Sequence, residues 1–185
     1  MKWEDTEQQV CSVARALSVL GERWTLLIIR DAFRGTRRFD DFQRGLGVTR
    51  HRLSERLRKL VEQGVLTRVP YQERPVRYEY RLTRKGLALY PVLMTLSQWG
   101  DDWMDDGNGP PQSYRHSLCG KVTRPVLTCD ECGEGLRPEE VSAQFGEVLG
   151  HYAAHLKAQG VPLPSDGELA RDAARYWREQ KGGGQ

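Results

Sequence analysis

The chain has 185 residues, a formal net charge of +3 and a mean hydropathy of −0.64. This length suits one domain with a sizeable core plus a smaller appendage, so two units are expected. No apolar run approaches the length of a membrane span, and the first residues are too polar for a signal peptide. The composition therefore argues against membrane and secreted proteins and predicts a cytoplasmic one.

The first helical stretch carries apolar residues at steps of three and four, interrupted near Gly21. Such a stripe predicts a face that is buried in a core. It comprises Leu17, Leu20, Trp24, Leu27 and Ile28.

A short helix, a tight turn and a second helix are predicted next. Phe39 and Phe42 stand at helical spacing, the run Gly45-Leu-Gly-Val breaks the chain, and Thr49 is a good N-cap residue. The second helix is predicted to run from Thr49 to Gln63 with one apolar face packed on the core. That face comprises Leu53, Leu57, Leu60 and Val61.

The opposite face of the second helix is polar and mostly basic. Residues 36–68 hold nine Lys and Arg against four Asp and Glu. Positive charge is thus concentrated where a helix can enter a groove of DNA, with a merely solvated face as the alternative. The polar side chains are His51, Arg52, Glu55, Arg58, Lys59 and Glu62, flanked by Arg50, Ser54 and Arg56.

Two strands joined by a turn are predicted after Gly64, which suits a helix C-cap. The strands are Val65-Leu-Thr-Arg-Val and Arg77-Tyr-Glu-Tyr-Arg-Leu, and the turn contains Pro70, Glu73, Arg74 and Pro75. The order of helix, turn, helix, strand, turn and strand is that of a winged helix-turn-helix, in which the turn forms the wing.

A long helix capped by Thr83 is predicted to follow the second strand. It carries more apolar surface than one small domain can cover alone, so we expect it to be a dimerisation helix. Its apolar residues are Leu87, Leu89, Tyr90, Leu93, Leu96, Trp99 and Trp103.

Taken together, these motifs resemble the HxlR family of bacterial winged-helix transcription regulators, over roughly residues 8 to 104. The resemblance implies a sequence-specific DNA-binding regulator, not an enzyme, that binds a pseudo-palindromic operator as a homodimer. A winged-helix protein that binds DNA or RNA without sequence preference is the alternative. The motifs are Cys11-Ser-Val-Ala-Arg, Leu20-Gly-Glu-Arg-Trp-Thr-Leu-Leu-Ile-Ile-Arg-Asp, Leu53-Ser-Glu-Arg-Leu-Arg-Lys-Leu and Tyr78-Glu-Tyr-Arg-Leu-Thr.

In this interpretation the N-terminal part of the second helix lies in the major groove. Arg52 or Arg56 contacts guanine, and His51 or Glu55 reads neighbouring base edges. Other basic residues of the helix and wing hold phosphates, which makes binding salt-dependent. The expected DNA-binding residues are Thr49, Arg50, His51, Arg52, Glu55, Arg56, Arg58, Lys59, Arg74 and Arg77.

Three of the four cysteines gather with a histidine in two short pairs, His116-x-x-Cys119-Gly and Cys129-x-x-Cys132-Gly. This spacing, with a glycine after each pair to permit a tight turn, predicts a structural, tetrahedral zinc site. Four protein ligands would close the shell and leave no open position for catalysis. Free thiols with an incidental histidine, or a redox pair at Cys129 and Cys132, are the alternatives.

Two hypotheses concern control of the regulator. Family members that sense oxidants or electrophiles use a cysteine at the position that matches Cys11, so the resemblance implies a thiol switch there. A helix dipole and Arg15 would stabilise its thiolate, while simple packing is the alternative. The second hypothesis is a small-molecule effector pocket, with an ordinary core stripe as its alternative. Its expected lining is Trp24, Tyr90, Trp99 and Trp103, with C-terminal aromatics.

Beyond Arg137, amphipathic helices are predicted from Pro138 to about Gln159 and from Ser165 to about Lys181. The predicted domains are residues 1–106 for DNA binding and dimerisation, 107–137 for the Cys/His knuckle, and 138–185 for a helical extension. The predicted fold class is α+β, mainly α: a winged helix-turn-helix with a long dimerisation helix and a small C-terminal appendage held by zinc.

Overall fold

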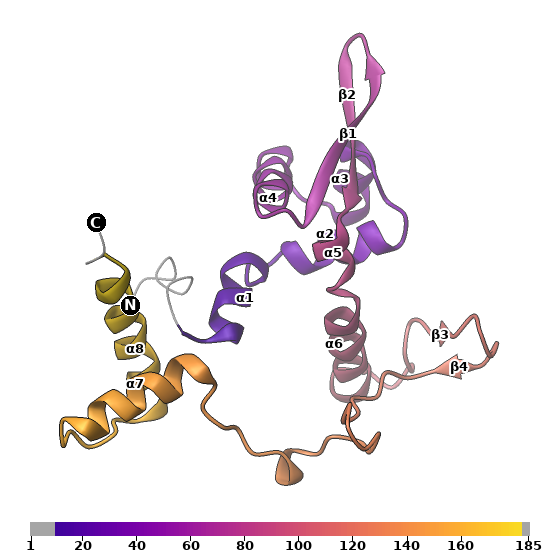
Figure 1. Ribbon diagram of the computed structural model, residues 1–185. Helices are drawn as coiled ribbons and strands as arrows, with labels where there is room; N and C mark the ends of the chain where they lie inside the picture. The colour runs from indigo at the N-terminus through magenta and orange to yellow at the C-terminus, as the bar shows by residue number, and fades with distance from the viewer. Residues whose placement is uncertain (1–9, 183–185) are drawn as a thin grey trace. The chain divides into compact units, whose positions relative to one another are not determined.

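In the computed structural model residues 10–182 are described, and they belong to two compact units (Figure 1). The larger unit comprises residues 23–140, and the smaller one comprises the described parts of residues 1–22 and 141–185. Among the helices of residues 10–182, none has both the length and the apolar character needed to cross a membrane.

Three helices build the core of the larger unit: α2 (Thr25–Phe33), α3 (Phe39–Leu46) and α4 (Arg50–Glu62). Each turns an apolar face inward, as the spacing of three and four residues predicts. Full burial of one large apolar side chain contributes about 1.5–3 kcal/mol relative to exposure, so this core fixes α4 firmly. The side chains with 0–1% exposure in these helices are Ile28, Ile29, Ala32, Phe42, Leu53, Leu57 and Leu60.

The turn between α3 and α4 depends on Gly47, whose φ of 63° lies in the left-handed region that favours glycine. Val48 follows and is 5% exposed, so it anchors the turn in the core. Thr49 then caps α4, because its hydroxyl oxygen accepts the backbone N–H of Arg52 at 3.5 Å. The helix, turn and helix predicted for this segment are confirmed.

The wing consists of two antiparallel strands, β1 (Leu66–Glu73) and β2 (Val76–Leu82). Both reach further toward the tip than the sequence predicts. The ladder carries a bulge between Pro70 and Gln72. A bulge increases the local twist, and here it lies closer to the tip of the hairpin than to its base.

A close contact between backbone segments holds the base of the wing. The Thr83 hydroxyl donates to the Gly64 carbonyl at 2.6 Å, and its oxygen accepts the Gly86 N–H at 3.1 Å. Gly86 is buried, and a Cβ at this position would lie 2.3 Å from the carbonyl oxygen of Val65. Only glycine allows the two segments to approach so closely.

The prediction of a single long helix after Thr83 is wrong. The chain instead forms two helices, α5 (Arg84–Leu87) and α6 (Tyr90–Trp103). Pro91 lies at the start of α6 and has no N–H to donate to the carbonyl of Leu87 one turn earlier. A continuous helix therefore cannot pass this point. The apolar residues predicted for one helix are divided between α5, α6 and the turn that joins them.

Two small hairpins follow α6 in the same unit. The first pairs β3 (Tyr114–Arg115) with β4 (Val122–Thr123), and the second is closed by a single bridge between Thr128 and Gly135. Side chains tie the first hairpin to α6. The Tyr114 hydroxyl lies 3.2 Å from Oγ of Ser97, and Arg124 is ion-paired with Asp102.

The smaller unit contains α1 (Ser12–Leu20), α7 (Glu147–Ala158) and α8 (Asp166–Gly182). α7 and α8 pack together. At the start of α8, Oε2 of Glu168 accepts the Ser165 N–H at 3.3 Å, as in a capping box, and the Ser165 hydroxyl at 2.7 Å; the hydroxyl bond is the main cause that lowers the pKa of that carboxyl. The buried side chains of α7 and α8 are Ala153, Leu156, Leu169, Ala173 and Ala174.

Two further predictions need correction. The helix predicted from Pro138 begins only at Glu147, because residues 138–140 form a single 3-10 turn and residues 141–146 are irregular. Leu17 was predicted to be buried in the first apolar stripe but is 40% exposed. The stripe is not one face, since α1 and α2 are separate helices that belong to different units.

The architecture is a mainly helical α+β winged helix-turn-helix with C-terminal helices, which agrees with the predicted class at that level. The domain boundaries predicted after residues 106 and 137 stay predictions. The two compact units divide the chain elsewhere, after residues 22 and 140.

Candidate nucleic-acid interface

The first turn of α4 presents its polar side chains to solvent. Arg50, His51 and Arg52 are all exposed, because the apolar positions of the helix turn the opposite side into the core. Within the described part of the chain, the side chains of His51 and Arg52 make no hydrogen bond or ion pair. Their donor groups are therefore available to a partner.

Farther along α4 the charged residues differ from one another. Arg58 is exposed and pairs with Glu62 at 2.6 Å, while Lys59 is half-buried. Arg56 pairs with Glu55 at 2.9 Å, and its side chain is only 13% exposed. The Arg56 side chain is thus far less accessible than that of Arg52, although the sequence placed it beside Arg52 as an alternative guanine contact.

Arg50 connects α4 to α3. Its Nη1 lies 3.3 Å from Oδ1 of Asp40 and 3.2 Å from Oε1 of Gln43, and its guanidinium lies 4.9 Å from the centre of the Phe39 ring. These contacts hold the side chain at the N-terminal end of α4, between the two helices of the motif.

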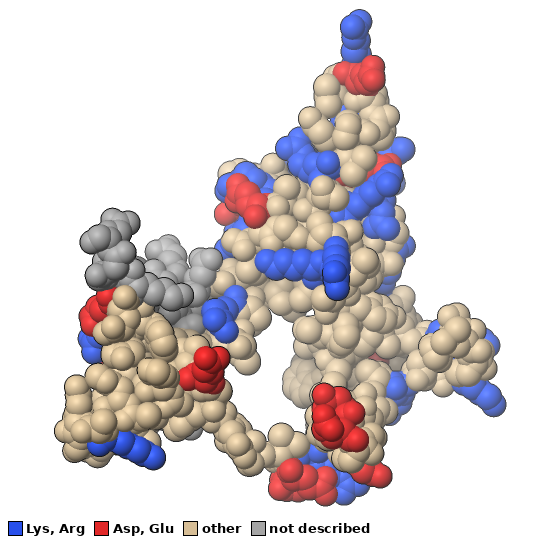
Figure 2. Space-filling view, viewed as in Figure 1, with Lys and Arg blue, Asp and Glu red and all other residues tan. Residues whose placement is uncertain are grey.

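The wing carries exposed arginines. Arg74 and Arg77 are exposed near its tip, as predicted. At mid-wing, the guanidinium of Arg68 stacks 3.9 Å from the centre of the Tyr78 ring. In Figure 2, Lys and Arg side chains gather over the wing and the helices at its base, with fewer acidic side chains among them.

A polar groove of about 480 Å³ lies between α3, the start of α4 and the wing. The sequence analysis missed two of its arginines, Arg38 and Arg44. For Arg38 a signal was present, because it belongs to a pair of adjacent arginines directly before α3. The charged and tyrosine side chains that line the groove are Arg38, Arg44, Arg50, Arg77, Asp40, Asp41, Tyr71, Tyr78 and Tyr80.

One wall of this groove is fixed by contacts between β2 and the segment before α3. The Tyr80 N–H donates to the Arg37 carbonyl at 2.8 Å. Glu79 lies 3.0 Å from Arg81 and 3.6 Å from Arg38. The hydrogen bond from Arg81, with a smaller contribution from Arg38, lowers the pKa of the Glu79 carboxyl. The wing is thereby attached to the helix-turn-helix beside the exposed face of α4.

Comparison with known proteins decides the family. Residues 19–108 match the HxlR-like helix-turn-helix model. The chain is 49% identical over 135 residues to the HTH-type transcriptional regulator Rv3095 of Mycobacterium tuberculosis, which is itself uncharacterised. The match covers 73% of this chain and 85% of the relative. The chain belongs to the HxlR family. It is therefore an HTH-type, DNA-binding transcriptional regulator, and this family consists of regulators rather than enzymes.

Other members support the same assignment. The Bacillus subtilis HTH-type regulator YvaP, also uncharacterised, is 40% identical over 92 residues, which are 49% of this chain and 85% of YvaP. The crystal structure of PA1607, a candidate transcription factor, has a TM-score of 0.68 and 39% identity, with 75% of this chain and 96% of PA1607 covered. The Rv3095 match is longer than residues 1–108, so it extends past the HxlR model into the segment with the hairpins.

The cysteine and histidine pairs of this HxlR protein lie at the tips of the two hairpins. His116 and Cys119 follow β3, and the His116 Nδ1 atom lies 3.5 Å from Sγ of Cys119. Backbone N–H groups of Cys132 and Glu131 lower the pKa of the Cys129 thiol, as does the Cys132 side chain. Among residues 10–182, no three His, Cys, Asp or Glu side chains lie close enough to share a metal ion.

Cys11 is half-buried and occupies the N-cap position of α1. Its place at a helix N-terminus agrees with the sequence. The Arg15 guanidinium, expected to support its thiolate, instead donates to the Ser12 hydroxyl at 3.2 Å. A thiol switch at Cys11 stays a prediction.

The effector pocket expected from Trp24, Tyr90, Trp99 and Trp103 stays a prediction, although two of these residues lie far apart on α6. Tyr90 and Trp103 are the two ends of α6, about 20 Å apart at 1.5 Å per residue. Tyr90 lies against Phe33 with ring centres 5.1 Å apart and lines a cavity of about 390 Å³. Trp99 and Trp103 are 56% and 75% exposed.

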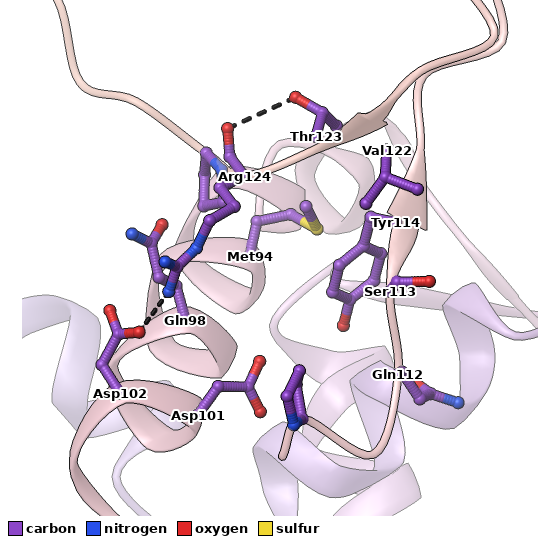
Figure 3. Close-up of a pocket in the computed structure, with 12 residues that line it drawn as sticks. Met94, Gln98, Asp101, Asp102, Gln112, Ser113, Tyr114, Val122, Thr123 and Arg124 are labelled. Carbon is purple, nitrogen blue, oxygen red and sulfur yellow. Dashed lines mark hydrogen bonds and ion pairs between the residues drawn. The ribbon is translucent and has the colours of Figure 1, made fainter.

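A different pocket, of about 310 Å³, lies between α6 and the first hairpin (Figure 3). Met94 lies on its α6 side, and Tyr114 and Val122 come from β3 and β4. Asp101 also borders the pocket, while the ion pair of Arg124 with Asp102 lies at its edge. The sequence did not predict this pocket, because its wall is formed by a hairpin whose two strands have two residues each.

Proposed function

We propose that this HxlR protein is a sequence-specific transcriptional regulator that binds a pseudo-palindromic operator as a homodimer. One observation carries the proposal: the side chains of His51 and Arg52 stand exposed at the capped N-terminus of α4, next to a groove and a wing that are rich in arginine. A face that only contacts solvent would not require His51 and Arg52 side chains, unpaired within the described chain, beside a second surface that is lined with arginines.

In the proposed complex the N-terminal turn of α4 enters the major groove. Arg52 makes a bidentate contact to O6 and N7 of guanine, and His51 contacts the neighbouring base edge. Thr49 supports this arrangement, since its cap fixes the first turn of the helix. Because the Arg56 side chain is only 13% exposed and pairs with Glu55, Arg52 carries the guanine contact.

The phosphate contacts surround this turn. Arg58 on α4 and Arg74 and Arg77 on the wing are exposed on elements that flank the arginine-lined groove. Each phosphate neutralised releases counterions, so several such contacts produce a steep decrease in affinity with salt. Phosphate contacts position the protein, while the first turn of α4 supplies the sequence preference.

The homodimer is supported by an apolar stripe on α6. Val92, Leu96, Trp99 and Trp103 follow one another at steps of four, three and four residues, and they are 44%, 46%, 56% and 75% exposed. A helical face of this kind marks an interaction site, and the same face on a second copy completes a two-fold interface. A two-fold dimer requires two half-sites about one helical turn of DNA apart, roughly 34 Å, or a multiple of that distance.

An effector that binds between α6 and the first hairpin would connect ligand binding to dimer geometry. The pocket shares α6 with the apolar stripe, so a ligand against Met94 and Tyr114 lies on the same helix as the proposed interface. Its volume falls near the lower end of the range for small-molecule sites. A compact molecule with an apolar body and a group that pairs with Asp101 fits this lining.

The deciding experiment is fluorescence anisotropy on a labelled duplex from upstream of the protein's own gene, against a scrambled duplex of equal length at physiological salt. We expect the native duplex to bind about a thousandfold more tightly, with two chains per duplex. Equal affinity for both duplexes, with a retained salt dependence, would instead establish the alternative of binding without sequence preference. The titration is repeated with oxidised protein, which tests control through Cys11.

A further inference from the structure

The two hairpin tips have the same backbone geometry, although their sequences differ. In the first, the His116 N–H donates to the Lys121 carbonyl at 2.9 Å, and the Gly120 N–H donates to the His116 carbonyl at 2.8 Å. In the second, the Cys129 N–H donates to the Glu134 carbonyl at 2.8 Å, and the Gly133 N–H donates to the Cys129 carbonyl at 2.9 Å. Each tip is therefore the same closed loop, with the two side chains of its pair three positions apart.

Both loops depend on a glycine after the second member of the pair. Gly120 has a φ of 68° and Gly133 a φ of 78°, values in the left-handed region that other residues rarely adopt. Nothing lies within 4 Å of a Cβ built on either residue, so backbone conformation rather than crowding requires glycine. A turn of this kind directs the side chains at the first and fourth positions to the same side, as in a metal knuckle.

The first pair already has the spacing of two ligands of one zinc ion. Zn–S and Zn–N bonds of about 2.3 and 2.1 Å at a tetrahedral angle place the two ligand atoms roughly 3.6 Å apart. The Nδ1 atom of His116 and Sγ of Cys119 are 3.5 Å apart. The Arg115 guanidinium donates to the carbonyl of Gly120, the residue after Cys119, at 2.7 Å and so places a positive charge at this loop.

The hairpins have no core that would hold them in shape. Residues 115–136 are all exposed except Pro125 and Cys129, which are half-buried. Several large apolar side chains lie open to solvent, with exposures of 61–89%. Units of this size are rarely stable without a metal, a disulfide or a partner. The exposed apolar side chains are Leu118, Val122, Val126 and Leu127.

We propose that His116, Cys119, Cys129 and Cys132 bind one structural Zn²⁺ that joins the two hairpins into a single zinc ribbon. One nitrogen and three sulfur ligands suit tetrahedral zinc and fill its shell, so the ion has no catalytic position. Three thiolates leave the site with one net negative charge, which Arg115 and Lys121 offset.

Zinc binding requires that the two hairpin tips come together, since the four side chains do not lie close enough in the structure to bind one ion. The connection permits this movement: residues 124–127 have no regular secondary structure and are exposed apart from Pro125. Closure brings Leu118 and Val122 toward Val126 and Leu127 and removes apolar surface from water. It also fixes β3 and β4, the hairpin wall of the pocket beside α6.

The test measures zinc in the full chain, expressed with zinc and purified under reducing conditions without chelators. We expect about one zinc per chain in the wild type and less than about 0.2 in each of H116A, C119S, C129S and C132S. Cys11→Ser and His151→Ala remove the same residue types outside the hairpins and retain about one zinc per chain. Because zinc content is independent of DNA binding, this result and that of the operator assay can fail separately.

Three outcomes would overturn the proposal. The first is less than about 0.2 zinc in the wild type combined with no tetrahedral thiolate spectrum when Co²⁺ is added to the reduced protein. The second is full zinc in H116A and C119S, which would show that the second hairpin binds metal without the first. Alkylation followed by mass spectrometry distinguishes the redox alternative, since a stoichiometric Cys129–Cys132 disulfide in protein from reduced cytosol also excludes the site.

Discussion

At the scale of single residues, Arg52 is the side chain on which sequence preference depends. The Arg52→Ala variant removes an exposed guanidinium that makes no contact within the described chain, so folding is retained. We expect operator affinity to decrease by about 1–3 kcal/mol, roughly five- to 150-fold, with a weaker preference over scrambled DNA.

The control for this prediction is Arg58→Ala, which removes an exposed arginine six residues farther along α4. Removal of a phosphate contact weakens binding to operator and scrambled DNA alike and reduces the salt slope by about 1. Anisotropy over a salt series separates the two behaviours. Unchanged affinity and unchanged preference in R52A would show that α4 does not read the bases through this residue.

The interface residues show what a sequence can and cannot predict at this scale. Helical spacing places Arg52 and Arg56 on neighbouring parts of one polar surface, because they are four residues apart. Rotamers and partners then separate them: Arg56 lies against Glu55 with 13% exposure, while Arg52 points to solvent. The groove arginine Arg38 was missed, since its importance depends on a contact with Glu79 that is distant in sequence.

At the scale of elements, the attachment of the wing depends on Gly86. A Cβ at this position would meet the Val65 carbonyl oxygen at 2.3 Å and Cδ2 of Leu82 at 2.9 Å. The Gly86→Ala variant therefore forces α5 away from Val65, which directly precedes β1, and we expect the free energy of unfolding to decrease by about 1–3 kcal/mol or more. Urea denaturation followed by circular dichroism measures this loss.

A second helical glycine provides the matched control. A Cβ at Gly45 in α3 would make only an ordinary contact, 3.8 Å from Oδ2 of Asp31. Gly45→Ala should thus be neutral or raise stability by about 0.5–1 kcal/mol, because alanine is the better helix former. If both variants lose equal stability, the close approach of Gly86 to Val65 does not explain the effect.

The pairing of β2 with the segment before α3 predicts a pH dependence. The titrating group is the Glu79 carboxyl of β2. Its pKa lies below the ordinary value of 4.5, because Arg81, and to a smaller extent Arg38, stabilise the charged form. A carboxyl with a lowered folded-state pKa contributes stability above its unfolded pKa and loses this contribution as the pH decreases through the folded value. The wild type should therefore lose its advantage over Glu79→Gln below pH 4.5.

Urea midpoints of both proteins between neutral and acidic pH measure this difference. Glu73→Gln removes a negative charge from an exposed position of the same wing and controls for net charge. A difference between wild type and Glu79→Gln that stays constant down to the lowest pH would show that the carboxylate pairs are not responsible.

Elements were predicted well where local chemistry determines them. The helix-turn-helix follows from the spacing of its apolar residues, the glycines that break the chain before Val48 and the cap residue Thr49. In the structure Gly47 has the positive φ that the turn requires. Prediction failed where two local signals competed. Apolar periodicity continues through Pro91, although its missing N–H keeps α5 and α6 separate, and Pro138 resembles a helix start although only a 3-10 turn forms.

At the scale of the whole molecule, the apolar stripe on α6 connects the fold to the operator. Leu96 is 46% exposed at the centre of α6 and is not needed for the core of the larger unit. In the proposed dimer it lies between two copies of α6. Leu96→Glu would place two carboxylates in that interface, where unpaired buried charges cost several kcal/mol.

We expect Leu96→Glu to sediment as a folded monomer, with circular dichroism like that of the wild type, while the wild type sediments as a dimer. Its operator affinity should decrease at least about tenfold, since one half-site contact no longer assists the other. Val161→Glu places the same charge at a position that is 43% exposed, outside α6, and should leave the dimer intact. Sedimentation of Leu96→Glu as a dimer would assign the interface to another surface, and a monomeric wild type with full operator affinity would refute the two-fold arrangement itself.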